Sequence, residues 1–329
     1  MADVHIGYAA ALEQFGPNEA IAAAELAERH GFRGVLAADH FQPWVPEQGQ
    51  SPYVWNVLSA VGARTTGDLG PGVTCPSFRS HPAVVAQAAA TLEVMYPGRT
   101  WLGVGAGEAL NEHVVGRYWP AGPERLAMMF EAVDVIQALF SGRDVKHDGR
   151  YFRLESTRLW TMPPAPPPIL VGTAGPVTAR RAGERCDGII TPGAPTEKVA
   201  GLLARFAAGA RGTGKDPEGM PKIVQLHLSW APTDEEALQN ALQQWPNGAM
   251  PFPKADIRSP YDFAALAARV RPEDFAGRLV ISADPDAHRA EIQRFLDLGV
   301  SAVYLHNVAR DQETWLEVFG REVLPKLHA

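Results

Sequence analysis

Short apolar runs recur along the chain, and most of them are followed by a stretch with apolar residues at helical spacing. The runs lie at residues 4–9, 34–38, 72–75, 101–105, 169–172, 188–191, 223–230 and 302–306. The helical stretches lie at residues 17–27, 82–95, 109–115, 176–184, 197–209, 234–244 and 314–327. A closed parallel barrel needs eight strands that alternate with helices, although a doubly wound open sheet has a similar alternation. The pattern favours an α/β fold of the (β/α)8 TIM barrel type.

Three segments are longer than a minimal barrel requires. They lie at residues 41–53, 144–168 and 246–279, and they are rich in Pro, Gly and aromatic residues. The second one has Gly149 and Arg150 between two extended stretches, which predicts a small hairpin outside the barrel. We see no linker that divides the chain, so residues 1–329 are expected to form a single domain. Loops after barrel strands surround the active site, and all three insertions are therefore expected to shape the pocket.

Composition and charge narrow the class of protein. Apolar residues make up 46% and charged residues 20% of the chain, as in ordinary globular proteins. The net charge of -7 gives no general attraction to nucleic acid, and no apolar stretch is long enough to span a membrane. The two cysteines, Cys75 and Cys186, indicate neither a disulfide framework nor a zinc site. We expect a cytoplasmic protein without a metal, nucleic-acid or membrane partner.

The segment AADHFQPW, at the end of the second predicted strand, brings together an acid, an imidazole and an indole. His40 can exchange a proton near neutral pH, and Asp39 beside it can anchor a ligand. Local hydrogen bonding at the start of the next element explains the same two residues equally well. Trp44 taken alone is more typical of packing.

The segment WLGVGAGEALNE carries three glycines and then Glu108 at a predicted helix start. Such glycines let the backbone approach a flat or anionic ligand closely. The spacing is not GxGxxG, because Glu108 stands where the third glycine belongs, and this disfavours a nicotinamide-binding open sheet. An acid in the first helical turn is also common on electrostatic grounds. A third segment, GTAGPVT at residues 172–178, resembles an anion seat at a helix start.

Together, ADHFQPW, CPSFRSHPAVVAQAAATL and GVGAGEALNE resemble the bacterial luciferase-like superfamily and, within it, the F420-dependent glucose-6-phosphate dehydrogenases. The resemblance runs almost end to end. It implies a homodimeric (β/α)8 barrel that transfers a hydride from a sugar phosphate or another alcohol to C5 of the deazaflavin of coenzyme F420. Carried over by position, the cofactor would be lined by Asp39, Gly72, Val73, Cys75, Ala106, Gly107, Asn111, Ala174, Gly175, Val177 and Thr178. The family's non-proline cis peptide would fall at Gly72–Val73.

The resemblance also implies roles in catalysis. His40 would take the alcohol proton, Glu108 would manage the proton on the deazaflavin ring nitrogen, Trp44 would pack over the reacting centre, and Glu13 would hold the substrate or His40. Which of His40 and Glu108 acts as the base stays open, because either can titrate under perturbation.

The chain departs from the family pattern at the substrate phosphate. Thr191, Lys254 and Arg278 match the family's Thr, one Lys and Arg, but residues 191–195 lack the second lysine. A sugar-site histidine aligns with Ala255, and Cys75 replaces a threonine at the cofactor. Hydride transfer to F420 is thus better supported than glucose 6-phosphate as donor. An FMN-dependent monooxygenase on the same scaffold and a deazaflavin-binding protein without chemistry are the alternatives.

Overall fold

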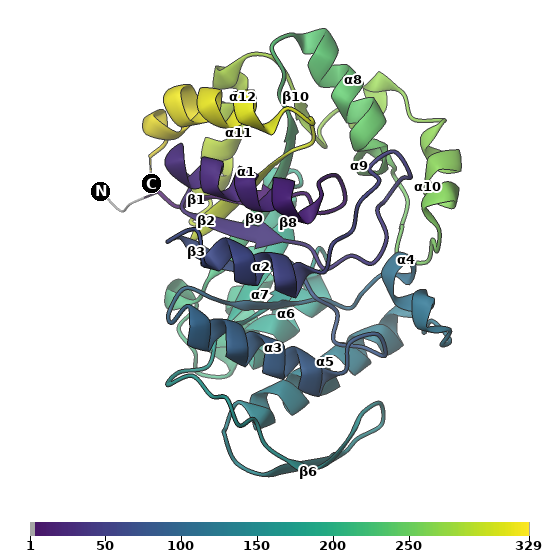
Figure 1. Cartoon of the computed structure of the whole chain (residues 1–329), viewed down its shortest axis with the longest axis vertical. Helices are drawn as coiled ribbons and strands as arrows, with labels where there is room; N and C mark the ends of the chain where they lie inside the picture. Colours follow the sequence, from purple (N-terminus) through teal and green to yellow (C-terminus); the bar gives the residue numbers. More distant parts are fainter. Residues whose placement is uncertain (1–3, 329) are drawn as a thin grey trace.

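The computed structural model describes residues 4–328, and eight parallel strands form its centre. They are β1 (Ile6–Ala10), β2 (Gly34–Ala37), β3 (Asp68–Pro71), β4 (Leu102–Val104), β7 (Ile169–Gly172), β8 (Gly188–Pro192), β9 (Lys222–Ser229) and β11 (Ala302–Asn307). The sheet runs in the order β3, β2, β1, β11, β9, β8, β7, β4. Figure 1 labels β1, β2, β3, β8 and β9 among them. Bridges from Leu69 to Thr100 and from Thr74 to Val104 bring β3 beside β4 and nearly close the ring. The prediction of a (β/α)8 TIM barrel is confirmed.

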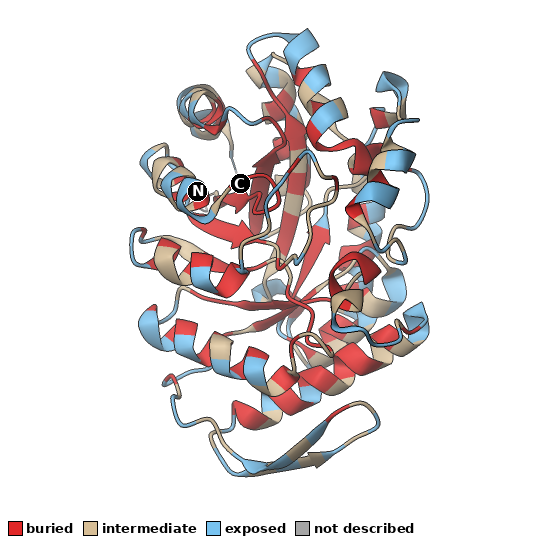
Figure 2. Cartoon of the chain, turned by 45° about the vertical axis from the view of Figure 1, so that its right-hand side comes forward, coloured by how far each residue is buried: buried red, intermediate tan, exposed pale blue. Residues whose placement is uncertain are grey.

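Helices follow the strands and cover the outside of the barrel. They are α1 (Pro17–Arg29), α2 (Val54–Gly62), α3 (Pro82–Met95), α5 (Gly122–Leu139), α6 (Pro176–Arg185), α7 (Thr196–Gly212), α8 (Asp234–Gln244), α11 (Pro285–Leu296) and α12 (Gln312–Val318). Figure 2 shows buried strands at the centre and helices that turn their exposed faces outward. None of the helices within residues 4–328 is both long enough and apolar enough to cross a lipid bilayer.

Large side chains fill the middle of the barrel interior. Trp101 and Tyr304 meet inside it with ring centroids 5.5 Å apart. Leu36, Leu170 and Ile223 pack into the same buried cluster. These large side chains fill the middle of the barrel, and active sites of this fold lie beyond such a layer, at the carboxyl ends of the strands.

Two expectations from the sequence were wrong in detail. The third strand is Asp68–Pro71 and not residues 72–75, which instead begin with a cis peptide bond at Gly72–Val73 and run towards the pocket. Residues 109–115 form only a short turn of helix, α4 (Ala109–Glu112), and a 3₁₀ turn, His113–Val115. The helix that covers β4 is α5, which the hydrophobic pattern did not reveal because it is buried on several faces.

The three insertions differ in position. Residues 144–168 contain the predicted hairpin, β5 (Val145–Asp148) and β6 (Arg153–Thr157), at the lower edge of Figure 1. The chain enters this segment from α5 and leaves it into β7, and the hairpin lies outside α5, with Arg150 beside Glu124 of that helix. None of its residues is among those that line the active-site cavity, so the expectation that it shapes the active site was wrong. Residues 246–279 hold α9 (Pro246–Ala249), α10 (Pro260–Ala267) and a 3₁₀ turn, Pro272–Phe275, and a short strand, β10 (Val280–Ile281), follows and pairs with β9.

Candidate active site

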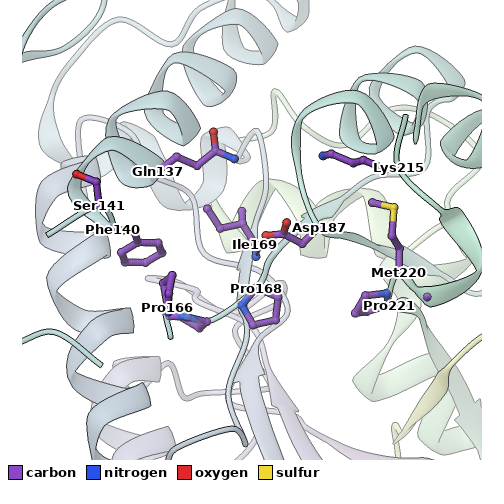
Figure 3. A pocket seen from close by; sticks show the side chains of 12 residues that line it. Gln137, Phe140, Ser141, Pro166, Pro168, Ile169, Asp187, Lys215, Met220 and Pro221 are labelled. Atoms are coloured by element: carbon purple, nitrogen blue, oxygen red, sulfur yellow. Dashed lines mark hydrogen bonds between the residues drawn. The ribbon is translucent and has the colours of Figure 1, made fainter. Parts of the chain in front are cut away.

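Two cavities lie at opposite ends of the barrel. The larger one, of about 720 Å³, is bordered by residues that precede β7, β8 and β9, so it lies at the amino ends of the strands. Figure 3 shows that prolines, Phe140 and Met220 form much of its wall. Its charged groups are already engaged, because Lys215 Nζ donates to the Cys186 carbonyl at 2.8 Å and Asp187 accepts from the Ile169 amide at 2.9 Å. Among the described residues that line this cavity, we therefore find no charged side chain without a partner.

The second cavity, of about 350 Å³, lies at the carboxyl ends of the strands. It collects side chains from separate strand-to-helix junctions, and its lining includes Glu13, Asp39, His40, Trp44, Gly72, Val73, Cys75, Ala106, Gly107, Glu108, Asn111, Glu112, Ala174, Gln225, His227 and Trp245. The four side chains to which the sequence assigned catalytic roles are all among them. We call this cavity the active-site pocket.

His40, Trp44 and Glu13 form one cluster on a wall of the pocket. His40 Nδ1 lies 3.4 Å from a Glu13 carboxylate oxygen and 3.3 Å from the Gln42 carbonyl oxygen. The Trp44 ring lies 5.0 Å from the His40 ring, and it packs edge-on against Phe263 of α10. With Nδ1 turned towards two oxygens, Nε2 is the nitrogen of His40 that is left to meet a ligand.

Glu108 faces the same pocket from the end of β4. It is the residue that precedes α4, and it is half-buried. Burial raises the pKa of its carboxyl above the ordinary value, and the nearby basic side chains of His40 and Lys254 oppose that rise. The carboxyl therefore holds a proton to a higher pH than an exposed glutamate does, which suits a group that donates a proton.

Glycines bring bare backbone to the pocket wall. Gly107 has φ of 76°, a conformation that favours glycine, and a Cβ atom there would lie 2.5 Å from Cys75 Sγ. At Gly105 a Cβ atom would lie 2.5 Å from Cγ2 of Val73, next to the cis peptide bond Gly72–Val73. A flat ligand can approach such a wall closely because no side chain stands out from it.

A buried ionic network that the sequence analysis did not assign supports this wall. Arg79 contacts both oxygens of Asp39, at 3.2 and 3.0 Å, and its Nε lies 3.0 Å from Glu112. The three side chains are 8%, 0% and 3% exposed. Thr74 also donates to Asp39 at 2.6 Å. The carboxylate of Asp39 is thus held by the protein, and the pKa of the Arg79 guanidinium is raised by the two acids, against the effect of its burial.

The remaining residues predicted to bind cofactor lie along one side of the pocket and beyond it. Asn111 lines the pocket, and its side-chain oxygen accepts from the backbone amides of Phe41 and Gln42. Ala174 lines it as well, whereas Gly175, Val177 and Thr178 lie just outside, at the amino end of α6. No side chain within residues 4–328 caps that helix, so its first amides are available to an anion.

The three residues predicted to bind the substrate are less uniform in their placement. Thr191 is buried in β8, and its hydroxyl bonds to the neighbouring Pro192 carbonyl. Lys254 Nζ donates to the Asn247 carbonyl at 2.7 Å, and its charge acts on both Glu108 and His227. Burial lowers the pKa of the Lys254 ammonium. Arg278 is exposed. The Lys254 charge therefore acts on two pocket residues, whereas Thr191 and Arg278 are not among the residues that line the pocket.

Further pocket residues come from β9 and from the end of α8. Gln225 and His227 are the polar positions of an otherwise apolar strand, spaced two apart, and both face the pocket. That spacing is the sequence signal that could have revealed them. Within residues 4–328, no group of three His, Cys, Asp or Glu side chains is arranged to hold a metal ion.

Comparison with known proteins places this site in a family. The model of the luciferase-like monooxygenase family matches residues 2–302. A protein of Microbacterium testaceum named F420-dependent glucose-6-phosphate dehydrogenase is 38% identical over 98% of this chain and 97% of its own length. A protein of the same name from Nocardia farcinica is 37% identical over 100% of this chain and 99% of its own.

A solved structure extends the comparison to three dimensions. An F420-dependent secondary alcohol dehydrogenase in complex with an F420–acetone adduct superposes with a TM-score of 0.93, at 33% identity over 99% of this chain and 100% of that one. The chain therefore belongs to the luciferase-like monooxygenase family, in the same branch as the F420-dependent glucose-6-phosphate dehydrogenases.

Proposed function

We propose that this protein is an F420-dependent dehydrogenase that oxidises a sugar phosphate or another alcohol. The observation that carries the proposal is the convergence of His40, Trp44, Glu13 and Glu108 on one pocket beside a glycine-lined wall. The names of the relatives and of the similar solved structure point to the same cofactor and to alcohols as donors.

The pocket fits the flat ring system of coenzyme F420. Gly107 and the Gly72–Val73 peptide supply a wall without protruding side chains, and the uncapped start of α6 offers amides to an anionic tail. Bound there, the coenzyme supplies a hydride acceptor at C5 of its deazaflavin. The protein has to hold the alcohol against that atom, remove a proton and supply a proton.

His40 is placed to take the proton from the substrate hydroxyl. Its Nδ1 is turned towards the Glu13 carboxylate and the Gln42 carbonyl, and an imidazolium that forms on proton transfer is stabilised by that carboxylate. As the C–H hydride leaves, the carbinol becomes a carbonyl and the hydroxyl proton moves to His40 Nε2. Trp44 packs against His40 and excludes water from that side.

Glu108 is placed to deliver the second proton. Because burial raises its pKa, the protonated form persists to higher pH than in an exposed glutamate. The carboxyl can therefore donate a proton to the ring nitrogen of the reduced coenzyme. This assignment gives the base role to His40 and the acid role to Glu108.

A spectroscopic assay with purified protein tests the proposal. Oxidised F420 with glucose 6-phosphate, and separately with 2-propanol, is expected to lose its deazaflavin absorbance. We expect His40→Ala to lower kcat by about 10² to 10⁴ without abolishing F420 binding measured by fluorescence titration. If the protein binds F420 but oxidises no alcohol, it is a carrier protein. If it is yellow as purified and consumes oxygen with reduced FMN, a monooxygenase is favoured.

The proposal extends to the setting in which the enzyme works. We propose a single-domain, cytoplasmic homodimer, as the family resemblance implies. Light scattering on the purified protein is expected to give twice the chain mass, and a monomer with full activity would overturn this part.

A further inference from the structure

A pair of histidines that the proposed mechanism does not use joins the active-site pocket to the buried core. His227 of β9 and His306 of β11 are neighbours in register, and their Nδ1 atoms are 2.8 Å apart. His227 lines the pocket, whereas His306 is only 3% exposed. Two nitrogens this close form a hydrogen bond only if one carries the proton and the other does not.

Gln14 decides which nitrogen carries it. The Gln14 amide nitrogen donates to the Val308 carbonyl at 2.9 Å and to Gln244 Oε1 at 3.0 Å. A backbone carbonyl can only accept, so the orientation of this amide is fixed, and its oxygen faces His306 Nε2 at 3.1 Å. His306 Nε2 therefore carries a proton and donates it to Gln14.

The rest of the chain of bonds follows if both rings are neutral. Burial lowers the pKa of His227 to about 4, with the Lys254 charge adding to the effect, and burial lowers the pKa of His306 well below its ordinary value. With Nε2 protonated, neutral His306 has a bare Nδ1 that accepts from His227 Nδ1–H. Neutral His227 then has a bare Nε2, which can only accept a hydrogen bond.

This bare nitrogen opens on the pocket. His227 Nε2 has no hydrogen-bond partner within residues 4–328, and it is not among the buried polar atoms that lack one. Trp245 stacks against the His227 ring at 4.6 Å and also contacts Trp44, whose ring in turn contacts His40. One continuous aromatic wall therefore joins His227 to the proposed base.

We propose that His227 Nε2 accepts a hydrogen bond from a second hydroxyl group of the substrate, and that it selects donors with more than one hydroxyl. This inference rests on the proposed function. A substrate hydroxyl satisfies the nitrogen lone pair, whereas an ionised phosphoryl or carboxylate oxygen carries no proton and would face that lone pair unfavourably. The phosphate of a sugar phosphate, if present, binds elsewhere in the pocket.

Nitrogen NMR of the wild-type protein tests the tautomer without any turnover. With ¹⁵N-labelled histidine, and with the His227 signals assigned by their loss in His227→Asn, we expect a protonated Nδ1 and an unprotonated Nε2 at neutral pH. The Nε2 signal is expected to move when 1,2-propanediol or glucose 6-phosphate is added and to stay in place with inorganic phosphate. A protonated Nε2, or a shift with phosphate alone, would overturn the inference.

Kinetics with two matched variants test the selection. In His227→Asn the shorter amide can still bond to His306 and the pocket acceptor is lost, whereas the His227→Gln amide oxygen can reach the Nε2 position. We expect the Asn substitution to lower kcat/KM for 1,2-propanediol about tenfold, mainly by raising KM. The value of kcat/KM for 2-propanol is expected to stay within about twofold of the wild type. The Gln variant is expected to recover most of the loss.

The outcomes separate the inference from the proposed function. Equal losses for the diol and for 2-propanol in His227→Asn, or no loss for either, would overturn the inference while the dehydrogenase activity stands. If no alcohol supports F420 reduction by the wild-type protein, the proposed function is wrong. The NMR titration would still decide whether His227 Nε2 accepts a hydrogen bond from a hydroxyl.

Discussion

Replacement of Arg79 by methionine tests the buried ionic network behind the pocket. The guanidinium serves two acids at once, Asp39 in a two-point contact and Glu112 through Nε, and all three side chains are at most 8% exposed. Methionine fills similar space without a charge, so Arg79→Met leaves two buried carboxylates without their cation. We expect a large loss of stability and a weaker affinity for F420, because Asp39 is no longer held.

The size of the loss can be worked out from the burial. Removal of one partner from a buried ion pair costs about 3–5 kcal/mol, and the double role of Arg79 places it near about 5 kcal/mol. An unfolding entropy of about 2.1 cal/mol/K per residue gives about 0.7 kcal/mol/K for 329 residues, so Tm falls by about 7 °C. The penalty is present at neutral pH and shrinks as pH falls, because the stranded carboxyls then have raised folded-state pKa values and take up protons.

Circular dichroism melts near about pH 7.5 and about pH 5.5 check both the size and the sign. Arg150→Met is the matched control, since Arg150 is 74% exposed and pairs with an exposed acid, and its Tm is expected to stay within about 1 °C. The triple variant Arg79→Met, Asp39→Asn, Glu112→Gln is expected to regain most of the stability. An Arg79→Met protein as stable as the control, or a penalty that grows at low pH, would show that Arg79 does not neutralise the two buried carboxylates.

Three further predictions follow from the pocket. Glu108→Gln is expected to lower kcat at least about tenfold. In a pH–rate profile, we expect the wild-type kcat to fall as pH rises through the raised pKa of Glu108, and this fall to be absent in the variant. Gly107→Ala places a Cβ atom 2.5 Å from Cys75 Sγ at a positive φ, so urea unfolding is expected to show a loss of about 2 kcal/mol, and fluorescence titration a weaker binding of F420. Because the pKa of His227 falls to about 4 on folding, from about 6.5 when unfolded, its contribution to stability is complete above pH 6.5 and is lost as pH falls towards 4. We expect urea unfolding at neutral pH and at about pH 5 to show a fall of about 2 kcal/mol in the wild-type free energy of unfolding. His227→Asn is not expected to show this fall.

The barrel could be predicted from the sequence because its parallel strands are buried on both faces. Runs such as residues 169–171, Ile-Leu-Val, are apolar throughout, and helical stretches follow most of these runs. The failures have physical causes. Pro71 and Gly70 look like turn residues, so β3 was placed four residues too late, and α5 is buried on too many sides to show a helical period.

The convergence of the proposed catalytic side chains on one pocket could be predicted, and the residues that support them could not. His40 and Glu108 come directly after strands, where barrel enzymes collect their chemistry. Arg79 lies in a segment whose apolar neighbours suggest only a helix start, and nothing local shows that it reaches Asp39, 40 positions earlier in the chain. The link from Gln14 to His306 spans 292 positions, so only the closed barrel brings the two together.

Residues 246–279 lie outside the barrel sheet and yet contribute Lys254 and the Phe263 ring behind Trp44. The segment packs against the rest of the protein through two small apolar clusters, one that joins Phe275 to Trp245 and Val308 and one that joins Met250 and Phe263 to Val45 and Leu110. Substitutions inside this segment can therefore change which alcohol is accepted while the strands keep their geometry. A transplant of the whole segment between relatives has to include the residues against which it packs, Val45, Leu110 and Val308.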